Sequence, residues 1–198
     1  MIRVMRRVID NQQVTSWAAQ LAFSFNAPKS KQSGIPTTSF PFRLRDEFNC
    51  TIRETFTTFG YWLEDYASVR LQLPGDQPRA LPWHQDSAVV LGKRFGYLQG
   101  VVVWLPLTPI TPSCPGLEIA RCPIPMLHYG DKSTGYLRMY HPPFGKREII
   151  SDLAPGDALI FNINYPHRTY LRPWMTLPRM SIDLRFVKEV PQSYKDKV

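Results

Sequence analysis

The sequence predicts a mainly β fold (a sandwich, jelly roll or barrel) with one or two helices near the N-terminus. From about residue 67 onward, short runs rich in β-branched and aromatic residues alternate with proline- and glycine-containing turns, a pattern typical of many short strands. The 198 residues include 19 prolines, and proline interrupts helices. Since no repeat, heptad pattern or low-complexity linker divides the chain, we expect a single domain over residues 1–198, with its core at about residues 67–187.

The first third of the chain contains the expected helical element. Within residues 9–25, apolar side chains such as Val14, Trp17 and Leu21 recur at helical spacing, and Asp10 precedes them as a candidate N-cap. Residues 26–42 are rich in turn formers and predict a loop. Residues 44–64 mix aromatic residues with threonines, and this pattern does not distinguish a helix from a strand.

The predicted strands follow one another in short steps along the remainder of the chain. In order they cover residues 69–73, the segment that carries His84 and Asp86, and residues 100–107, 117–120, 147–150, 158–164 and 179–187. A long excursion at residues 122–146 interrupts this series. Residues 189–198 are charged and are expected to fray.

Composition limits the classes of partner and the cellular location. The formal net charge is +8 and the sequence pI is about 9.6, which indicates either an anionic partner, such as nucleic acid or a phosphorylated substrate, or merely a solvated basic surface. Cys50, Cys114 and Cys122 are odd in number and lack CxxC spacing, which favours reduced thiols and a cytoplasmic location. No apolar run approaches the roughly 18–20 residues of a membrane-spanning helix. The oligomeric state stays open.

Three side chains have the chemistry of an iron site. In an extended strand His84 and Asp86 point to the same face, because side chains alternate. His167 follows the apolar strand 158–164 and is the candidate third ligand. Two imidazoles and one carboxylate form the 2-His-1-carboxylate facial triad that suits non-haem Fe(II). The alternative is that the His-x-Asp motif arose by chance and that His167 is simply a polar residue at the end of a strand, with no metal bound. His128 and His141 lack a carboxylate at strand spacing and are expected not to be ligands.

The last predicted strand alternates strictly between polar and apolar side chains. Arg179, Ser181, Asp183 and Arg185 share one face, with apolar residues between them. This pattern fits an edge strand that exposes its polar side to water, and it equally fits the inner wall of a barrel that holds a small polar ligand. A guanidinium grips a carboxylate with two charge-assisted hydrogen bonds, and a hydroxyl on the same face can add a third. A dicarboxylate would fit this arrangement.

In order and spacing, His84-x-Asp86, His167 and Arg179-x-Ser181 resemble the Fe(II)/2-oxoglutarate-dependent oxygenases, and most of all the phytanoyl-CoA dioxygenase family. The similarity covers about residues 67–187. It extends to the run Val103–Thr108, to the Gly116-Leu117-Glu118 step and to the Pro155-Gly156-Asp157 turn before the second histidine. The resemblance implies a double-stranded β-helix, which is a jelly-roll or cupin-like fold.

The resemblance also implies a role for each matching residue. His84, Asp86 and His167 would bind Fe(II) as the catalytic centre. Arg179, assisted by Ser181, would bind the distal carboxylate of 2-oxoglutarate, and Arg70 and Gln72 would line the pocket. The implied reaction uses O2, converts 2-oxoglutarate to succinate and CO2, and hydroxylates a small molecule, with ascorbate as an additional candidate reductant. A carboxylate at Asp86 favours hydroxylation, desaturation or ring chemistry and disfavours halogenation, and hydroxylation is not distinguished from desaturation.

The sequence leaves alternatives open for both the substrate and the class of protein. The first third of the chain matches no family, and Ala120-Arg121-Cys122 stands where the family often has Gly-Ser-His. An anionic or carrier-linked substrate would fit a mouth made basic by Arg70, Arg94, Arg168 and Arg172. The alternative enzyme is an AlkB-like nucleic-acid demethylase, compatible with the Arg-x5-Arg spacing from Arg179 to Arg185 and with the basic charge. The alternative outside catalysis is a binding module on the same fold.

Overall fold

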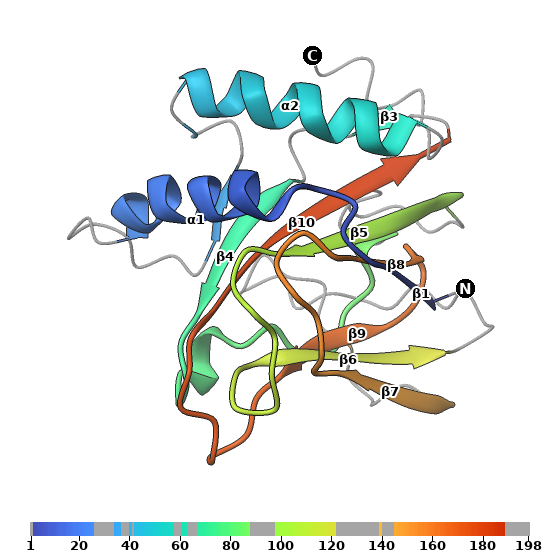
Figure 1. Cartoon of the computed structure of the whole chain (residues 1–198). Coiled ribbons are helices and arrows are strands. Elements are labelled where there is room, and N and C mark those ends of the chain that lie inside the picture. The colour runs from blue at the N-terminus through green and yellow to red at the C-terminus, as the bar shows by residue number, and fades with distance from the viewer. Residues whose placement is uncertain are drawn as a thin grey trace.

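The part of the chain that the structure describes folds into two antiparallel β-sheets and two α-helices, α1 and α2 (Figure 1). The computed structural model describes residues 2–25, 34–36, 40, 42–57, 61–62, 67–87, 98–121, 139 and 145–188. Within these residues the expectation of a mainly β fold with N-terminal helices is confirmed.

The larger sheet has seven strands among the described residues and places β10 in its middle. The order is β1-β8-β5-β10-β4-β2, and β3 also pairs with β10. Its strands are β1 (Ile2–Met5), β2 (Gly34–Pro36), β3 (Tyr61–Trp62), β4 (Ser68–Gln72), β5 (Gly100–Pro106), β8 (Ala158–Asn162) and β10 (Arg179–Val187). Because β10 has hydrogen-bonded neighbours on both sides, it is not an edge strand.

The alternating residues of β10 therefore face two different parts of the interior. Met180, Ile182, Leu184 and Phe186 belong to the core shared with the helices. Their polar neighbours point the other way, toward the smaller sheet, yet all nine residues of β10 are buried. The polar face predicted from the sequence thus lines the inside of the protein.

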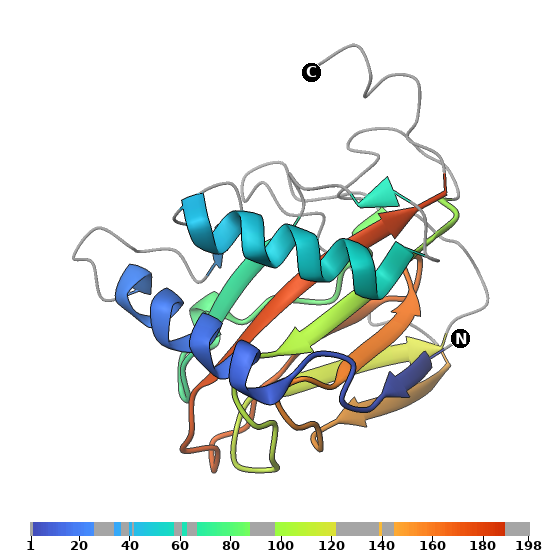
Figure 2. The ribbon, with the colours of Figure 1, turned by 45° about the horizontal axis from the view of Figure 1, so that its top comes forward.

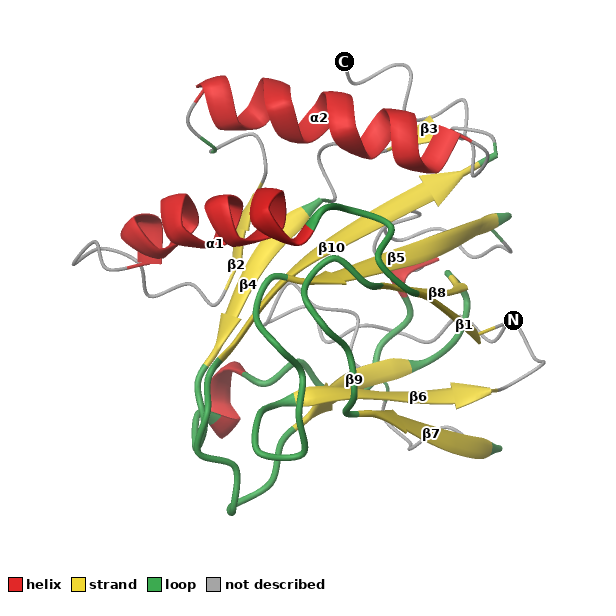
Figure 3. Ribbon diagram, viewed as in Figure 1, coloured by secondary structure: helices red, strands yellow, loops and turns green. Residues whose placement is uncertain are grey.

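The two helices lie together on one face of the larger sheet (Figures 2 and 3). α2 (Phe42–Phe56) buries Leu44, Phe48, Ile52 and Phe56, a spacing that places them on one helical face. α1 (Asn11–Phe25) is capped as expected, because the Asp10 carboxylate accepts hydrogen bonds from the backbone N–H groups of Gln12 and Gln13. The helix–sheet core also contains Trp17, as expected.

The smaller sheet faces the opposite side of the larger one. It contains β7 (Lys146–Ile150), β6 (Gly116–Arg121) and β9 (His167–Tyr170) in the order β7-β6-β9. Leu117 and Ile119 of β6 pack with Val102 and Trp104 of β5 and with Phe161 of β8 in a second core. The space between the two sheets is therefore bounded by apolar residues and by the polar face of β10.

Several elements differ from the sequence-based expectations. The ambiguous stretch 44–64 forms most of α2, followed by β3. β1 was not expected, and β2 lies inside the predicted loop 26–42. Both are short end strands of the sheet, held by partners distant in the sequence, so local sequence carries little signal of their pairing. The excursion 122–146 and the tail 189–198 lie largely outside the described residues. No helix among the described residues is long and apolar enough to cross a membrane.

Candidate metal centre

His84 and His167 are brought together by a short backbone bridge rather than by two complete strands. The N–H of each residue donates to the carbonyl of the other, at 3.0 Å from His84 and 2.9 Å from His167. Nearby, the backbone N–H of Thr169 donates to the carbonyl of Leu81. Pro82, between Leu81 and His84, has no N–H to contribute to a ladder. The bridge thus consists of one residue pair.

The expectation that His84 and Asp86 share a face of one strand is wrong. Asp86 and Ser87 have helical backbone, and the N–H of Ser87 donates to the carbonyl of Ile163 at 3.1 Å. The chain turns directly after His84, and this turn, rather than strand alternation, places the Asp86 carboxylate beside the imidazole. The residue types predicted the ligand set, whereas the local backbone differs.

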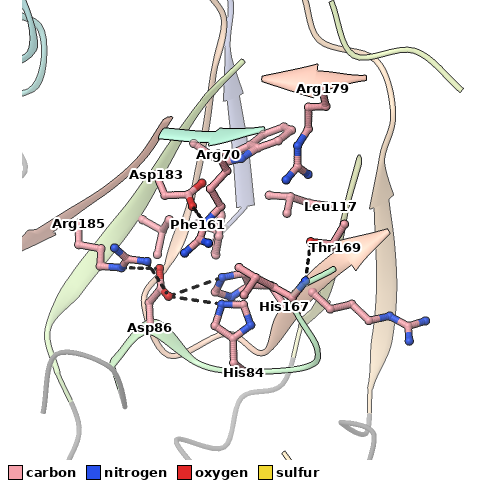
Figure 4. A pocket seen from close by; sticks show the side chains of 14 residues that line it. Arg70, His84, Asp86, Leu117, Phe161, His167, Thr169, Arg179, Asp183 and Arg185 are labelled. Atoms are coloured by element: carbon pink, nitrogen blue, oxygen red, sulfur yellow. Dashed lines mark hydrogen bonds and ion pairs between the residues drawn. The ribbon is translucent and has the colours of Figure 1, made fainter. Parts of the chain in front are cut away.

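The three side chains converge on one point (Figure 4). Potential ligand atoms of His84, Asp86 and His167 all lie within 4.8 Å of one another. Asp86 Oδ1 is 3.6 Å from His84 Nε2 and 3.8 Å from His167 Nε2. Each Nδ1 lies close to a backbone carbonyl, that of Pro82 at 2.7 Å and that of Tyr165 at 3.0 Å. A proton on Nδ1 would satisfy these carbonyls and leave both Nε2 lone pairs free to bind a metal.

The charge states of the site also suit a metal. Burial and the neighbouring His167 lower the pKa of His84 to about 3, so that imidazole is neutral at physiological pH. For Asp86, burial alone would raise the pKa, but the charge of Arg185 and the two histidines hold it below its usual range. A neutral imidazole and an ionised carboxylate are the forms that bind metal ions.

Arg185 contacts the Asp86 carboxylate directly, which the sequence did not predict. Arg185 Nη2 donates a hydrogen bond to Asp86 Oδ1 at 3.1 Å, and Nε makes an ion-pair contact with Oδ2 at 2.8 Å. Arg185 is 5% exposed and Asp86 1% exposed, so this is a buried ion pair. Its only sequence signal was the place of Arg185 on the polar face of β10.

A cavity between the two sheets extends from the three ligands to Arg179. Its polar lining includes Arg70, Asp183 and Arg185 beside the ligands, and its apolar lining includes Trp104, Leu117 and Phe161. The structure thus brings Arg70, Arg179 and the predicted metal ligands to one cavity. Inside it, Arg70 Nε donates to the Asp183 carboxylate.

Arg179 is a buried cation with donor capacity to spare. It is 2% exposed, and its guanidinium carbon lies 5.3 Å from the ring centre of Trp104. Nη1 donates to the carbonyl of Gly116 at 3.0 Å. Burial lowers the pKa of Arg179 to about 10, so the group stays charged at neutral pH.

Beside the candidate ligands, Ser87 Oγ, Asp86 Oδ2 and Arg185 Nε have no hydrogen-bond partner among the described residues, although the last two form an ion pair. Around Arg179 the same holds for three buried polar atoms: Nε of Arg179, Oγ of Ser181 and Nε1 of Trp104. Leaving such groups unpaired costs about 1–3 kcal/mol each. Two N–H donors and a hydroxyl beside a cation fit a carboxylate, which supplies acceptors only. The residues present therefore fit both Fe(II) and an anionic co-substrate.

Gln72 has a different environment from the one that the resemblance implied. Its side-chain amide donates to the carbonyls of Leu73 and Asp76 at 3.3 and 3.0 Å, and it is absent from the lining of the cavity. Gln72 therefore stabilises the turn after β4, where the carbonyls of Leu73 and Asp76 also accept backbone hydrogen bonds. Ser181, although buried beside Arg179 on β10, is also absent from that lining.

Of the other candidate residues, two arginines are placed by the structure, and three residues lie outside the part that it describes. Arg168 lines the cavity, but its guanidinium binds Glu118 at 2.6 Å and lies 4.9 Å from the ring centre of Trp83. Arg172 lies over the ring of Tyr170, beside a second hollow that Arg168 also lines. Arg94, His128 and His141 lie outside the described residues.

Comparison with known proteins shows a likeness in structure alone. No family model matches the sequence, and no curated protein matches it. Among solved structures, the non-heme alpha ketoglutarate dependent carbocyclase SnoK from nogalamycin biosynthesis has a TM-score of 0.66 at 12% identity, covering 100% of this chain and 86% of that chain.

Two further solved structures carry ligands of interest. EvdO2 from Micromonospora carbonacea var. aurantiaca, complexed with 2-oxoglutarate, has a TM-score of 0.66 at 18% identity, covering 95% of this chain and 86% of that chain. The epimerase SnoN, in complex with Fe3+, alpha ketoglutarate and nogalamycin RO, has a TM-score of 0.66 at 12% identity, covering 100% of this chain and 85% of that chain. At these identities the likeness establishes the fold. This chain has the fold of non-heme, alpha ketoglutarate dependent enzymes.

Proposed function

We propose that this protein is a non-haem Fe(II)- and 2-oxoglutarate-dependent oxygenase that oxidises a small molecule and releases succinate and CO2. The observation that carries the proposal is the buried His84–Asp86–His167 cluster, which opens into the same cavity as the partly unpaired cation Arg179. We further propose one oxygenase domain over residues 1–198, built on a double-stranded β-helix. Within the superfamily, the sequence pattern favours a phytanoyl-CoA dioxygenase-like enzyme.

Each residue of the site has a defined task in this proposal. His84 Nε2, His167 Nε2 and Asp86 Oδ1 would hold Fe(II), since two imidazoles and one carboxylate are a ligand set that suits non-haem iron. Bound there, the iron would supply the redox chemistry with O2 and 2-oxoglutarate. The carbonyls of Pro82 and Tyr165 hold the two imidazoles in the orientation that directs Nε2 to the metal.

Arg179 would bind the distal carboxylate of 2-oxoglutarate. Among the residues that the structure describes, its Nε has no hydrogen-bond partner, and neither has the Ser181 hydroxyl or the Trp104 indole N–H in the same region. Arg70 lines the cavity and would contribute positive charge to it. The apolar side chains of Leu117 and Phe161 exclude water from the cavity walls, which strengthens these charged contacts.

The charge of the cavity also favours an anionic co-substrate. Four arginines and the acids Asp86 and Asp183 line it. Arg168 is paired with Glu118, which is not part of the lining, so Arg70, Arg179 and Arg185 are the cations to be counted. Three cations against two anions leave one excess positive charge, and Fe(II) would raise it further. A dianion such as 2-oxoglutarate would offset this charge.

The proposed substrate is a small molecule, and hydroxylation is the proposed outcome. Asp86 supplies a carboxylate ligand, which leaves no place for a halide in its position. The net charge of +8 is compatible with an anionic or carrier-linked substrate. No contact among the described residues specifically favours the nucleic-acid alternative.

The test is anaerobic titration of Fe(II) and 2-oxoglutarate, followed by exposure to O2. We expect a weak visible charge-transfer band in the wild type and succinate formation once O2 is admitted. Asp86→Ala is expected to remove the band. The matched control is Asp152→Ala, since the Asp152 side chain is 93% exposed and lies outside the cavity lining. A wild-type protein with neither band nor succinate would refute the proposal and favour the non-catalytic binding module.

A further inference from the structure

The carboxylate of Asp86 is approached from two sides (Figure 4). The imidazole Nε2 atoms of His84 and His167 face Oδ1 at 3.6 and 3.8 Å. The guanidinium of Arg185 lies on the other side and reaches both oxygens, Oδ1 through Nη2 at 3.1 Å and Oδ2 through Nε at 2.8 Å. Asp86 is thus shared between a candidate metal position and a fixed cation.

We propose that Arg185 is a positioning residue that restricts Asp86 to metal binding through the single oxygen Oδ1. This inference rests on the proposed metal site and adds a function for Arg185, which acts through the Asp86 carboxylate. The proposed effect of Arg185 is on the number of coordination positions of the metal ion that protein atoms would occupy.

The geometry of a carboxylate carries the argument. A metal bound by both oxygens sits between them, in front of the carboxylate carbon. The Arg185 guanidinium spans both oxygens and therefore occupies that region. The lone pair of Oδ1 that points toward the two imidazoles stays available. Two-oxygen binding would require Arg185 to move, and at 5% exposure in the central strand β10 its side chain is enclosed by the protein.

Arg185 is itself fixed by its surroundings. It belongs to the longest strand of the larger sheet, paired with β5 through Val102. Two acids, Asp86 and Asp183, lie near its guanidinium. Asp183 in turn is held by Arg70. Asp86, Arg185, Asp183 and Arg70 therefore form a row of alternating charges from the ligand cluster into the cavity.

The consequence concerns the number of open positions. Two imidazoles and one carboxylate oxygen occupy three positions of a six-coordinate ion and leave three open. Chelation by 2-oxoglutarate would use two of these and leave one for O2. A carboxylate bound through both oxygens would remove that last position. By this reasoning Arg185 preserves the vacancy that the oxygenase reaction needs.

The experiment uses Co2+ as the probe, because its visible d–d absorption depends on the number and arrangement of donor atoms. Wild-type protein, Arg185→Gln and Arg185→Lys are titrated with Co2+ without 2-oxoglutarate. Arg185→Lys keeps a balancing charge beside Asp86 but lacks the planar fork, so it is the variant expected to fold even if Arg185→Gln does not. Circular dichroism checks folding. The matched control is Arg6→Gln, because Arg6 binds the buried carboxylate of Asp157 at 2.6 Å, outside this cavity.

We expect both Arg185 variants to bind Co2+ about 10- to 100-fold more weakly, as is usual when a residue that orients a metal ligand is lost. We also expect an altered d–d spectrum, while Arg6→Gln keeps the wild-type affinity and spectrum. A wild-type spectrum in Arg185→Lys would overturn the proposal, because charge alone would then suffice. Failure of the wild type to bind Co2+ would instead overturn the metal site, and with it this inference.

Discussion

Replacing Arg179 offers the sharpest test of the co-substrate site. In Arg179→Ala the protein loses the buried cation at the end of the cavity away from the ligands, and the ligands themselves are untouched. Arg179 is 2% exposed, and its ring neighbour Trp104 is 1% exposed, so a carboxylate bound here would be desolvated. Loss of one partner of a buried, hydrogen-bonded charge pair costs about 2–5 kcal/mol. At 1.4 kcal/mol per factor of ten, the 2-oxoglutarate requirement should rise by roughly 30-fold to several thousand-fold.

The assay measures two affinities separately. Succinate formation as a function of 2-oxoglutarate concentration gives the co-substrate requirement, and Co2+ titration without 2-oxoglutarate gives metal affinity. Arg179→Lys is the conservative variant, since it keeps the charge and loses the planar fork; it should fall between the wild type and Arg179→Ala. Because Arg179 also donates to the carbonyl of Gly116, thermal unfolding must show that both variants are folded.

One result would refute the reasoning. If Arg179→Ala weakened Co2+ binding as much as it raised the 2-oxoglutarate requirement, Arg179 would be a general structural residue of the cavity. An unchanged requirement for 2-oxoglutarate would mean that its distal carboxylate binds elsewhere. Arg70 lines the same cavity and was also predicted as a pocket residue, so it would be the next candidate.

Further predictions concern pH, metal removal and nucleic acid. His84 has a pKa of about 3 when folded, against an ordinary histidine pKa of 6.5, so between these two pH values the unfolded chain binds a proton that the folded chain does not. The unfolding free energy of the metal-free protein should therefore fall as the pH is lowered from 6.5 toward 3, by up to about 4 kcal/mol. Urea unfolding across this range should show the slope, and His84→Gln should reduce it; an unreduced slope would contradict the cause given. Chelation by EDTA should abolish succinate formation and added Fe(II) should restore it; turnover that survives chelation would refute iron dependence. Binding to single-stranded DNA should be weak and non-specific at physiological salt; tight binding with a steep salt dependence would favour the nucleic-acid alternative instead.

The match between sequence and fold is best where periodicity and burial agree. The strand Arg179–Val187 was predicted with its observed bounds, because strict alternation over nine residues leaves little room for another structure. The helix over residues 9–25 was predicted for the same reason, with its cap at Asp10. The stretch 44–64 resisted interpretation because its aromatic residues serve a helix and a strand equally well, and only packing against the sheet decides between them.

The candidate site shows the same division. The residue types at 84, 86 and 167 and their order suggested an iron site, because two histidines and one carboxylate are the ligands of the facial triad that suits non-haem Fe(II). The sequence by itself determined this set of candidate ligands, the polar face of the last strand and the position of Arg179 on it. These are properties of residue type and local spacing, which the chain carries without its fold.

Tertiary structure alone decided which way the polar face looks and what each side chain touches. β10 became a central strand because β5 and β4 pair with its two edges, and this turned a pattern that fits a solvated edge into the wall of a cavity. The turn at Asp86, the diversion of Gln72 to the carbonyls of Leu73 and Asp76, and the grip of Arg185 on Asp86 also arise from the fold. Asp86 and Arg185 are 99 residues apart in the chain, and a contact over that separation leaves no trace in local sequence.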